Sequence, residues 1–585
     1  MIAPGIEPGR ERWGWNNRAK RAESRTDVCL RWSHQSVLVG DTVYIYGGQA
    51  KTSPDQSLNT WNNNFLTLDL GKDWSIAAPY FQGLPQPDGP PAVANGYLWH
   101  NSENIYLYGG LFSDKPDAAP TAFSLWQYNI KSAEWSDITS KTSIDSDSGG
   151  KSIQRAAEGA GVSIPDRGLG YYFGGHLDSY TTEGWSKQTP RIYLKSLLQF
   201  DMNKNQFLNV TENGLEDAGV PERADSVLLF VPWGSEGILV GIGGGLNDTF
   251  SQLNIIDIYD VSSRKWTKQA TDGTTPKYRV NPCAVVGSAS DGSSHNIYFF
   301  GGQNLVPYGE QVQYNDMWIL SIPSFSWIKV DTDGQTVPSA RAGHTCELHG
   351  SDMVVIGGYV GQELSCDSPG IYVFDAYTTQ WKTEYKSPTS SSSNSAEKEV
   401  AGFYRVPDVV ISVIGGDATG GATVTKPGMT ADPDSPVATG KPGDYKYTTI
   451  TSHTAAAPTV ATITNSDGSV STTTTYANST ILGDPNDPGK SPNVGLIIGA
   501  SLAGIVLLVL LLLGAAYMWY RKKIKELREA SEKLASNMEY SGGMSREGLG
   551  GELERSESAN ELLGEEPTFW GVLLSPRRSL RVVNH

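Results

Sequence analysis

VYIYGG at residues 43–48 is the first of seven stretches in which an apolar run ends in a pair of glycines. The other six are IYLYGG (105–110), GYYFGG (170–175), ILVGIGGG (238–245), IYFFGG (297–302), MVVIGG (353–358) and VISVIGG (410–416). They recur at intervals of roughly 56 to 69 residues, and such recurrence indicates a repeat architecture.

A second apolar run and a spaced aromatic follow the glycines in the complete repeats. In five repeats the two positions are seven residues apart: Tyr128 and Trp135, Phe200 and Phe207, Tyr259 and Trp266, Leu320 and Trp327, Phe374 and Trp381. Each unit reads as three or four short strands, and such sheets bury both faces when they stack around an axis. The paired glycines are interpreted as structural: Gly47, Gly48, Gly109, Gly110, Gly174, Gly175, Gly243, Gly244, Gly301, Gly302, Gly357, Gly358, Gly415 and Gly416.

These repeats resemble those of the kelch family, in which a double glycine follows one strand and a spaced aromatic pair comes later. Arg31-x-x-His34 and Arg341-x-x-His344 resemble the opening strand of that repeat. The resemblance implies an all-β propeller over residues 27–420, similar to fungal kelch-repeat membrane or wall-associated proteins. Seven blades are favoured and six are the alternative, because the seventh repeat has two strands near 405–416 but lacks its aromatic.

The remaining segments predict a single-pass membrane protein. Residues 494–520 are 27 uncharged residues, which as a helix exceed the ~30 Å hydrocarbon core, and RKKIKELR follows them. This charge asymmetry places the C-terminus in the cytosol and the propeller outside, at the plasma membrane. Residues 421–493 form a Ser/Thr/Pro-rich, disordered stalk, and 521–585 a mostly disordered tail. Gly495, Gly499 and Ala503 suggest self-association through the membrane helix.

The N-terminus conflicts with this topology. Residues 1–26 lack the apolar core of about 7–15 residues that a secretory signal needs. We therefore expect that the written start is misassigned and that a signal-bearing segment precedes the repeats; a cytosolic propeller is the alternative. Three glycosylation sequons begin at Asn209, Asn247 and Asn478, all before the membrane segment. Cys346 and Cys366 suggest a local disulfide, with two buried free cysteines as the alternative.

The sequence contains no motif that indicates nucleic-acid binding, catalysis or a metal site. The net charge of −17 argues against a nucleic-acid partner. Galactose oxidase has a kelch-type propeller, but no residues here match its copper site, and no nucleophile elbow, zinc motif or phosphate loop occurs. No enzyme activity, cofactor or metal is therefore expected.

The leading hypothesis is a binding module for a protein or glycan. The first three repeats are longer, which places insertions at 50–62, 111–124 and 176–191, where propeller loops bind ligands. Trp61, Phe112, Tyr180 and Trp185 are the candidate contacts, with packing against their own blades as the alternative. A membrane-tethered scaffold facing the cytosol is the second hypothesis.

Overall fold

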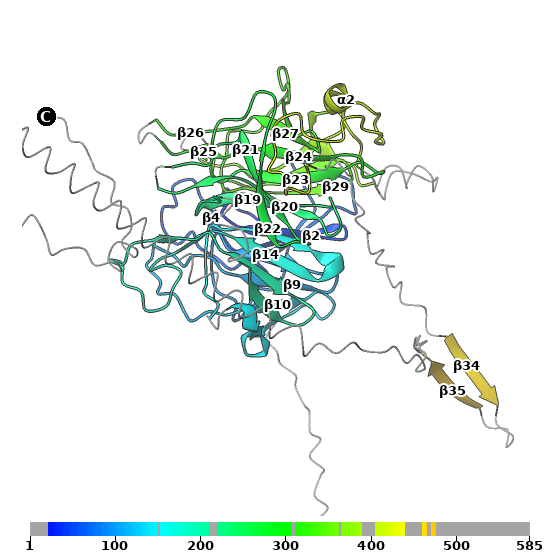
Figure 1. The fold of residues 1–585 in the computed structure, drawn as a ribbon. Helices are drawn as coiled ribbons and strands as arrows, with labels where there is room; N and C mark the ends of the chain where they lie inside the picture. Colours follow the sequence, from blue (N-terminus) through cyan, green and yellow to red (C-terminus); the bar gives the residue numbers. More distant parts are fainter. Residues whose placement is uncertain are drawn as a thin grey trace, which may run out of the picture. The chain divides into compact units, whose positions relative to one another are not determined.

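The computed structural model describes residues 22–148, 152–210, 219–247, 249–306, 310–361, 364–388, 404–438, 459–464 and 470–475. The chain divides into two units, 1–454 and 455–585, which are described separately. The described part of the first unit is an antiparallel β-propeller, in which the sheets surround a central axis (Figure 1).

Six sheets form the blades. In each sheet the antiparallel strands follow one another in chain order, with the first strand at the axis and the last at the rim. Blade 1 contains β2 (Gln35–Val39), β3 (Thr42–Tyr46), β5 (Phe65–Asp69) and β7 (Phe81–Gly83). Blade 2 contains β8 (Tyr97–His100), β9 (Asn104–Tyr108), β10 (Trp126–Asn129) and β11 (Glu134–Asp137). Blade 3 contains β13 (Ala160–Ile164), β14 (Leu169–Phe173), β17 (Leu197–Asp201) and β18 (Gln206–Asn209), and the short strand β12 (Ser143–Ile144) pairs in parallel with β18 at its edge. Blade 4 contains β19 (Ala224–Val231), β20 (Ile238–Gly245), β21 (Ile255–Asp260) and β22 (Lys265–Ala270). Blade 5 contains β23 (Cys283–Ser288), β24 (His295–Phe300), β27 (Met317–Ile322) and β28 (Ser326–Lys329). Blade 6 contains β29 (Thr345–His349), β30 (Asp352–Ile356), β31 (Ile371–Asp375) and β32 (Gln380–Lys382).

Short elements decorate the connections between these strands. Four two-stranded ribbons pair β1 (Leu30–Trp32) with β4 (Gln49–Lys51), β6 (Trp74–Ser75) with β33 (Glu384–Tyr385), β15 (His176–Leu177) with β16 (Ile192–Tyr193), and β25 (Gln303–Asn304) with β26 (Val312–Gln313). Three 3₁₀ turns cover Thr139–Lys141, Ser146–Ser148 and Pro165–Arg167.

The seven-residue aromatic spacing is the register of the outer hairpin in blades 2 to 6. In blade 2, for example, Tyr128 on β10 lies directly opposite Trp135 on β11. The other four pairs face each other in the same way. Each turn holds one residue with positive φ five positions after the first partner: Ala133, Asn205, Arg264, Phe325 and Thr379. Equal turns thus give equal registers.

The hydrophobic core consists of six layers, and each layer lies between two neighbouring blades. Trp99 of blade 2, for instance, is fully buried against Tyr172 and Phe200 of blade 3. The other five clusters occupy the remaining junctions, including the one between blades 6 and 1. Each fully buried large side chain contributes roughly 1.5–3 kcal/mol. The blades are therefore held chiefly by packing against their neighbours.

The paired glycines join each blade to the next. The N–H of the second glycine donates to a backbone carbonyl at the start of the following blade; Gly48 bonds Val93 at 2.9 Å, and Gly358 bonds Arg31 at 2.7 Å across the closure. A Cβ on the first glycine would meet the same carbonyl, as Gly109 shows, with Ala156 oxygen 2.3 Å away. Both glycines also have positive φ. The first six pairs therefore lie at the junctions between blades, where the next blade leaves little room for a side chain on the first glycine.

A closed ring of backbone hydrogen bonds fixes the blade number. One residue with positive φ stands at or just before the start of each innermost strand, and its N–H donates to the carbonyl of its counterpart in the preceding blade, at 2.6–3.1 Å. Ser33 of blade 1 donates to Gly343 of blade 6, which closes the circle. We call these six residues the axial ring: Ser33, Asn95, Glu158, Asp225, Asn281 and Gly343.

The preference for seven blades is wrong, because blades 6 and 1 are direct neighbours. The seventh apolar run is not a strand but α2 (Asp408–Ile414). Val410 and Ile414 are four residues apart on one side of the helix, and both are buried in the layer between blades 5 and 6. Gly415 ends the helix, since its N–H donates to the carbonyl of Ile411 at 2.8 Å.

The suggested disulfide between Cys346 and Cys366 is also wrong. Cys366 pairs with Cys29, and Cys346 pairs with Cys283. Cys29–Cys366 joins the segment before blade 1 to blade 6, whereas Cys283–Cys346 joins the innermost strands of blades 5 and 6. Sequence proximity misled this prediction, because ring closure brings distant parts of the chain together.

The chain stays on the propeller beyond the last blade. Val437 is fully buried in the layer between blades 4 and 5, and the Trp233 indole N–H donates to the carbonyl of Pro436 at 3.3 Å. Both residues belong to the region that composition assigns to a stalk.

The described residues of the second unit form one hairpin, β34 (Thr459–Thr464) and β35 (Val470–Thr475). This departs from the expectation of a wholly disordered stalk; the strands are rich in threonine and valine, which favour extended backbone. In the part of the chain that the structure describes, no helix has the length and apolarity needed to span a bilayer. Residues 494–520, the predicted membrane segment, lie outside the described residues, as do 1–21 and the tail.

Candidate functional site

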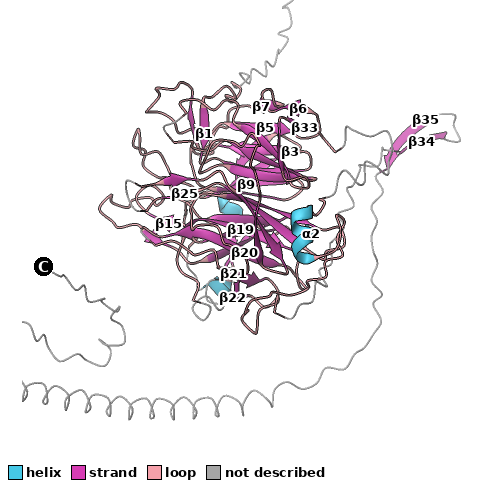
Figure 2. Ribbon diagram, turned by 90° about the horizontal axis from the view of Figure 1, so that it is seen from above, coloured by secondary structure: helices cyan, strands magenta, loops and turns pink. Residues whose placement is uncertain are grey.

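The two ends of the propeller differ, and the end that carries the axial ring is called the mouth face. There the innermost strands begin and the connections between second and third strands emerge. Two of these connections, marked by β4 and β25, lie on the left of Figure 1, and those marked by β15 and β25 lie on the left of Figure 2, whereas α2 lies on the right in both. Near its end, the described chain of the first unit contacts Trp233, which follows the innermost strand β19 at the end opposite the mouth face.

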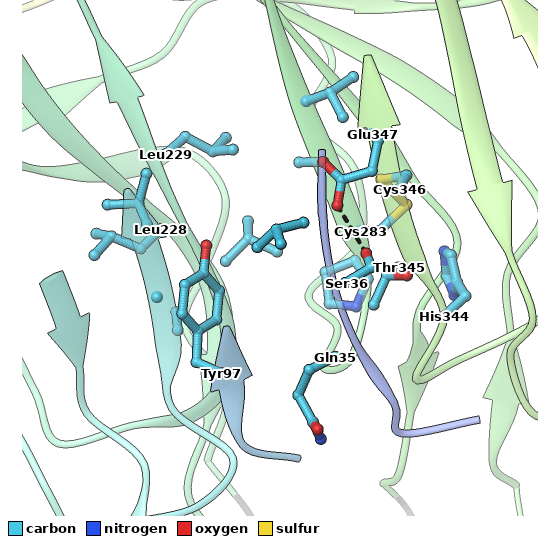
Figure 3. A pocket seen from close by; sticks show the side chains of 18 of the residues that line it. Gln35, Ser36, Tyr97, Leu228, Leu229, Cys283, His344, Thr345, Cys346 and Glu347 are labelled. Carbon is cyan, nitrogen blue, oxygen red and sulfur yellow. Dashed lines mark hydrogen bonds between the residues drawn. A yellow bond between two sulfur atoms is a disulfide. The ribbon is translucent and has the colours of Figure 1, made fainter. Parts of the chain in front are cut away.

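A central cavity of about 460 Å³ runs along the axis between the six innermost strands (Figure 3). Such a volume falls within the ~300–1,000 Å³ typical of ligand pockets. Toward the mouth its wall is polar, with Asn95, Glu158 and Asp225 of the axial ring. Toward the other end most wall residues are apolar, such as Val286 and Leu348, although His100 and Ser163 also lie there. The end at the mouth is therefore the more polar of the two.

Glu347 is the carboxylate on the wall inside the cavity. It accepts a hydrogen bond of 2.7 Å from the Ser36 hydroxyl of the neighbouring blade, as Figure 3 shows. Burial raises the pKa of Glu347 to about 7, although the Ser36 hydroxyl and the Leu38 backbone oppose this shift. Tyr97 stands on another wall, and its ring covers Gly161, where a Cβ would lie 2.3 Å from it. The carboxylate thus faces a cavity narrowed by one tyrosine.

Histidines in the cavity wall are uncharged at neutral pH. Burial lowers the pKa of His34 and of His344 to about 3, and that of His100 to about 4. His34 shares a 2.9 Å hydrogen bond with Thr345 across the closure. His344 lies 3.2 Å from the Phe300 carbonyl. Both histidines of the Arg-x-x-His pattern therefore have structural contacts between blades.

The three long insertions support one another across blades 1 to 3 on the mouth face. The Asn59 N–H donates to the Lys115 carbonyl at 3.3 Å, which links the first insertion to the second. The Phe112 N–H donates to the Tyr180 carbonyl at 2.9 Å, which links the second to the third. We call this connected surface the loop platform, formed by residues 50–62, 111–124 and 176–191. The sequence predicted the insertions but not their contacts.

The four candidate aromatics take different positions in the loop platform. Trp61 is half-buried, and its indole N–H donates to Asp114 at 3.3 Å. Phe112 is buried beneath the Arg155 guanidinium, 4.8 Å from its ring centre, so it supports the platform from below. Tyr180 and Trp185 are half-buried in the third insertion. Their contact with a ligand stays a prediction.

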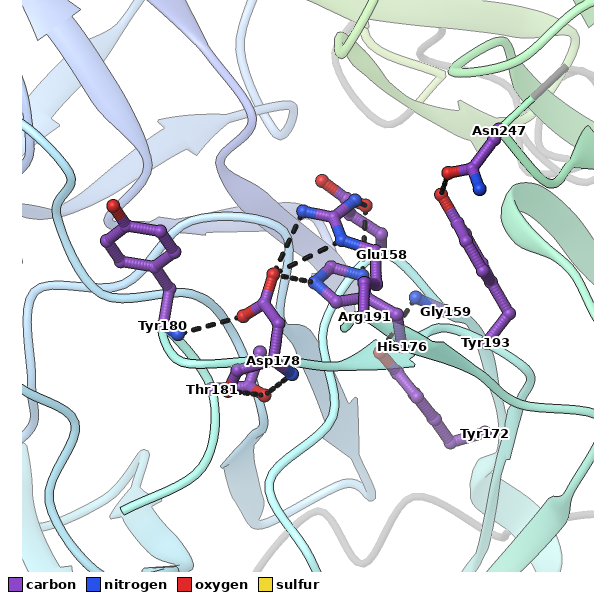
Figure 4. Close-up of polar contacts among 10 residues, drawn as sticks. All are labelled: Glu158, Gly159, Tyr172, His176, Asp178, Tyr180, Thr181, Arg191, Tyr193 and Asn247. Atoms are coloured by element: carbon purple, nitrogen blue, oxygen red, sulfur yellow. Dashed lines mark hydrogen bonds and ion pairs between the residues drawn. The ribbon is translucent and has the colours of Figure 1, made fainter. Parts of the chain in front are cut away.

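A buried ionic network anchors the third insertion (Figure 4). His176 follows the double glycine of blade 3 and has no exposed side-chain surface. Its Nδ1 lies 3.0 Å from the Glu158 carboxylate and its Nε2 3.2 Å from that of Asp178. Arg191, at the end of the insertion, bonds the same two carboxylates at 3.1 and 3.0 Å. No sequence pattern pointed to this network, because its members are separated by up to 33 residues and join only through the fold.

The network holds its groups in charged form. Burial alone would lower the pKa of His176, but hydrogen bonds to Asp178 and Glu158 raise it to about 9. Burial opposes ionisation of Asp178, yet His176 and Arg191 bring its pKa to about 2. Glu158 keeps a lowered pKa for the same reason. Neighbouring Asp225 has a pKa well above its ordinary value because of burial and the charge of Glu158.

Two of the three glycosylation sequons have their asparagine among the described residues. Asn247 is exposed on the mouth face, where its side-chain oxygen accepts a 3.0 Å bond from the Tyr193 hydroxyl. Asn209 ends β18 and is half-buried, and Asn478 lies outside the described residues. Among the residues that the structure places, no group of three or more His, Cys, Asp or Glu is arranged to hold a metal ion.

Fold and site together define a six-bladed propeller with an axial cavity and loops gathered at its mouth. The KLHDC2/KLHL20/DRC7 Kelch-repeats domain matches residues 229–425. A "Kelch repeat-containing protein" of Arthroderma benhamiae is 44% identical over 97% of this chain and 94% of its own length. The chain therefore belongs to the kelch-repeat family.

More distant matches cover smaller parts of the chain. Human "Host cell factor 2" is 30% identical over 24% of this chain and 18% of its own length. Human "Kelch domain-containing protein 3" is 28% identical over 26% of this chain and 41% of its own length. The solved structure of YjhT covers 61% of this chain at 15% identity and a TM-score of 0.40.

Proposed function

We propose that this kelch-repeat protein is a non-enzymatic binding module that recognises a protein partner with its mouth face. The observation that carries this proposal is the loop platform, in which three long insertions brace one another over half of the ring. Loops positioned by a rigid scaffold are where binding surfaces usually lie. The axial ring and six packed layers supply that rigidity.

Exposed apolar side chains on the mouth face support this proposal. In the described residues, four of the nine large apolar side chains with high exposure belong to connections at this face. They are Leu58, Ile192, Val312 and Leu364, with 55%, 48%, 49% and 37% of their surface exposed. Exposed apolar side chains in these connections favour a protein as the partner, because a protein interface buries such groups at its centre.

We propose further that the propeller is extracellular and held by a membrane helix at 494–520. All four cysteines are in disulfides, which persist in oxidising compartments. The sequon at Asn247 is exposed, as glycosylation requires. The charge asymmetry around 494–520 gives the same orientation.

Site-specific photo-crosslinking tests the binding face. A photo-reactive phenylalanine analogue replaces Leu58 on the mouth face, or Tyr80 near the opposite face as the matched control. The two positions are 55% and 51% exposed, so they sample solvent about equally. We expect covalent protein adducts in native cells from position 58 and few from position 80. Equal adducts from both positions, or adducts from position 80 alone, would contradict the proposal.

Glycosidase treatment tests the orientation. With a C-terminal tag on the native protein, we expect N-glycosidase to lower its mass, and protease added to sealed vesicles to remove the tag but spare the propeller. A constant mass with digestion of the propeller from the cytosolic side would instead favour the membrane-tethered scaffold.

A further inference from the structure

We propose that the central cavity accepts a basic side chain, an arginine or lysine on a narrow segment of the protein partner, and pairs it with Glu347. This inference rests on the proposed binding function and specifies the chemistry that the mouth face selects. We infer the kind of side chain from three properties of the cavity: the charges on its wall, the polar residues at its mouth and its volume.

Among the described residues of the cavity wall, Glu347 is a carboxylate that no ion pair neutralises. The carboxylates of the wall are Glu158 and Asp225 at the axial ring and Glu347 deeper inside. The three histidines of the wall are uncharged because burial disfavours their protonation. No lysine or arginine is among the described residues that line it. A cavity with walls of one sign concentrates counter-charge, so a cationic group is attracted and an anionic one is repelled.

Two of the three carboxylates are unavailable to an incoming cation, because Glu158 is already paired and burial keeps Asp225 from ionising, which leaves Glu347 as the acceptor. Glu158 is paired with His176 and Arg191. Asp225 is adjacent to Glu158 in the axial ring, and that neighbour disfavours its ionisation. Glu347 has neutral partners, the hydroxyl of Ser36 and the backbone of Leu38. A cation beside it would replace lost hydration with a charge-assisted hydrogen bond.

The geometry fits a long, flexible basic side chain. Glu347 lies further along β29 than the axial-ring residue Gly343, so the group must pass the ring to reach it. Polar residues of the axial ring line this path from the mouth, whereas most wall residues at the far end are apolar. Lysine and arginine combine an apolar stem with a charged head, which suits a wall that contains both Tyr97 and Glu347. Figure 3 shows these two side chains on different walls of the cavity.

Selection from a random 12-residue peptide library on the purified full chain tests this inference. We expect selected peptides to share an arginine or lysine. In a selected peptide, replacing arginine with uncharged, nearly isosteric citrulline should weaken binding about tenfold or more, as for a close charge pair. On the Glu347→Gln variant, the same replacement should change affinity by about twofold or less. The amide in this variant carries no charge to pair with a cation, but it retains an oxygen for the Ser36 hydroxyl.

A matched control and the contrary outcomes keep the experiment decisive. Glu236→Gln removes a half-exposed carboxylate that does not line the cavity, and it should leave the citrulline effect unchanged. Peptides that bind without a basic residue, or an equal citrulline effect on Glu347→Gln, would overturn this inference and leave the binding function standing. Absence of any selected peptide would also overturn it; crosslinking from position 58 would then decide whether the binding function itself survives.

Discussion

Buried arginines connect each repeat to its own double glycine in the second half of the propeller. Arg341, for example, is fully buried, donates to the Gly357 carbonyl at 2.7 Å and pairs with Asp367 at 3.1 Å. Its guanidinium also lies 4.4 Å from the ring centre of Tyr372. A guanidinium holds its donors in a rigid planar fork, so it bonds a carbonyl and a carboxylate in a defined geometry and stacks on a ring, whereas the lysine ammonium is a flexible point charge. Arg223 and Arg279 make corresponding contacts with Gly243 and Asp257, and with Gly301 and Asp316.

His176 is predicted to stabilise the propeller in a pH-dependent way. Its folded pKa of about 9 exceeds the ordinary value of 6.5, so its contribution is complete below pH 6.5 and is lost as the pH rises through 9. His176→Asn should therefore lower the melting temperature at pH 6, by the equivalent of about 3 kcal/mol. The difference from the wild type should shrink by pH 10. Melting curves at both pH values measure it.

The opposite pH dependence is expected on the acid side, where Asp178 loses its charge. Its pKa of about 2 lies below the ordinary 3.8, so this stabilisation is present above pH 3.8 and disappears as the pH falls through 2.

The alkaline comparison decides whether His176 is charged in the folded protein. A difference in melting temperature between the wild type and His176→Asn that stays constant from pH 6 to 10 would show that the network does not hold a charged histidine.

Glu347 should make the affinity for an arginine peptide depend on pH. Its pKa of about 7 means that it is roughly one-tenth ionised at pH 6 and nine-tenths at pH 8. Because a cation pairs with the ionised carboxylate, binding should strengthen several-fold over this interval, while the three histidines stay neutral. Titration calorimetry at pH 6, 7 and 8 measures this change, and comparison with Glu347→Gln separates it from Asp225. An unchanged slope in that variant would contradict the assignment.

At the scale of the elements, each double-glycine turn packs directly against the backbone of the following blade. Gly357→Ala would place a Cβ 2.4 Å from the Arg31 carbonyl at φ +59°, so the junction between blades 6 and 1 must open. Gly40→Ala is the matched control, since Gly40 has φ +60° but no atom within 4 Å of that Cβ. We expect the control to lose about 1 kcal/mol and Gly357→Ala about 3 kcal/mol or more. Urea unfolding of both variants measures the difference, and equal losses would mean that backbone conformation alone matters.

At the scale of the whole molecule, ring closure brings together the ends of a chain segment of more than 300 residues. Cys29–Cys366 joins positions 337 residues apart, and Cys283–Cys346 joins positions 63 apart. If the bonds act by restricting the unfolded chain, replacing the first pair with serine should cost about 1.5 kcal/mol more than replacing the second. Melting temperatures of the two double variants measure this. A larger loss for Cys283–Cys346 would indicate that local packing dominates.

Much of the fold could be predicted from local sequence. The six true double glycines mark the end of each second strand, and the seven-residue pairs carry the register of the outer hairpin in blades 2 to 6, because their backbone conformations and turns are determined within a few residues. The same local reasoning failed at 410–416, where an apolar run before two glycines forms a helix. Val410 and Ile414 lie four apart, and tertiary packing selected that period over the alternating one.

The candidate site could be predicted only in part. Insertion lengths located the loops at 50–62, 111–124 and 176–191, since extra residues must leave the compact sheets. The cavity charge at Glu347, the partners of His176 and both disulfides depend on residues that are far apart in the chain. The sequence by itself therefore determined the repeat, its strands and its loops, whereas the tertiary structure decided the blade number, the cysteine pairs and the acidic cavity. The physical reason is that closure of a ring is a property of all its junctions together, and no single repeat contains it.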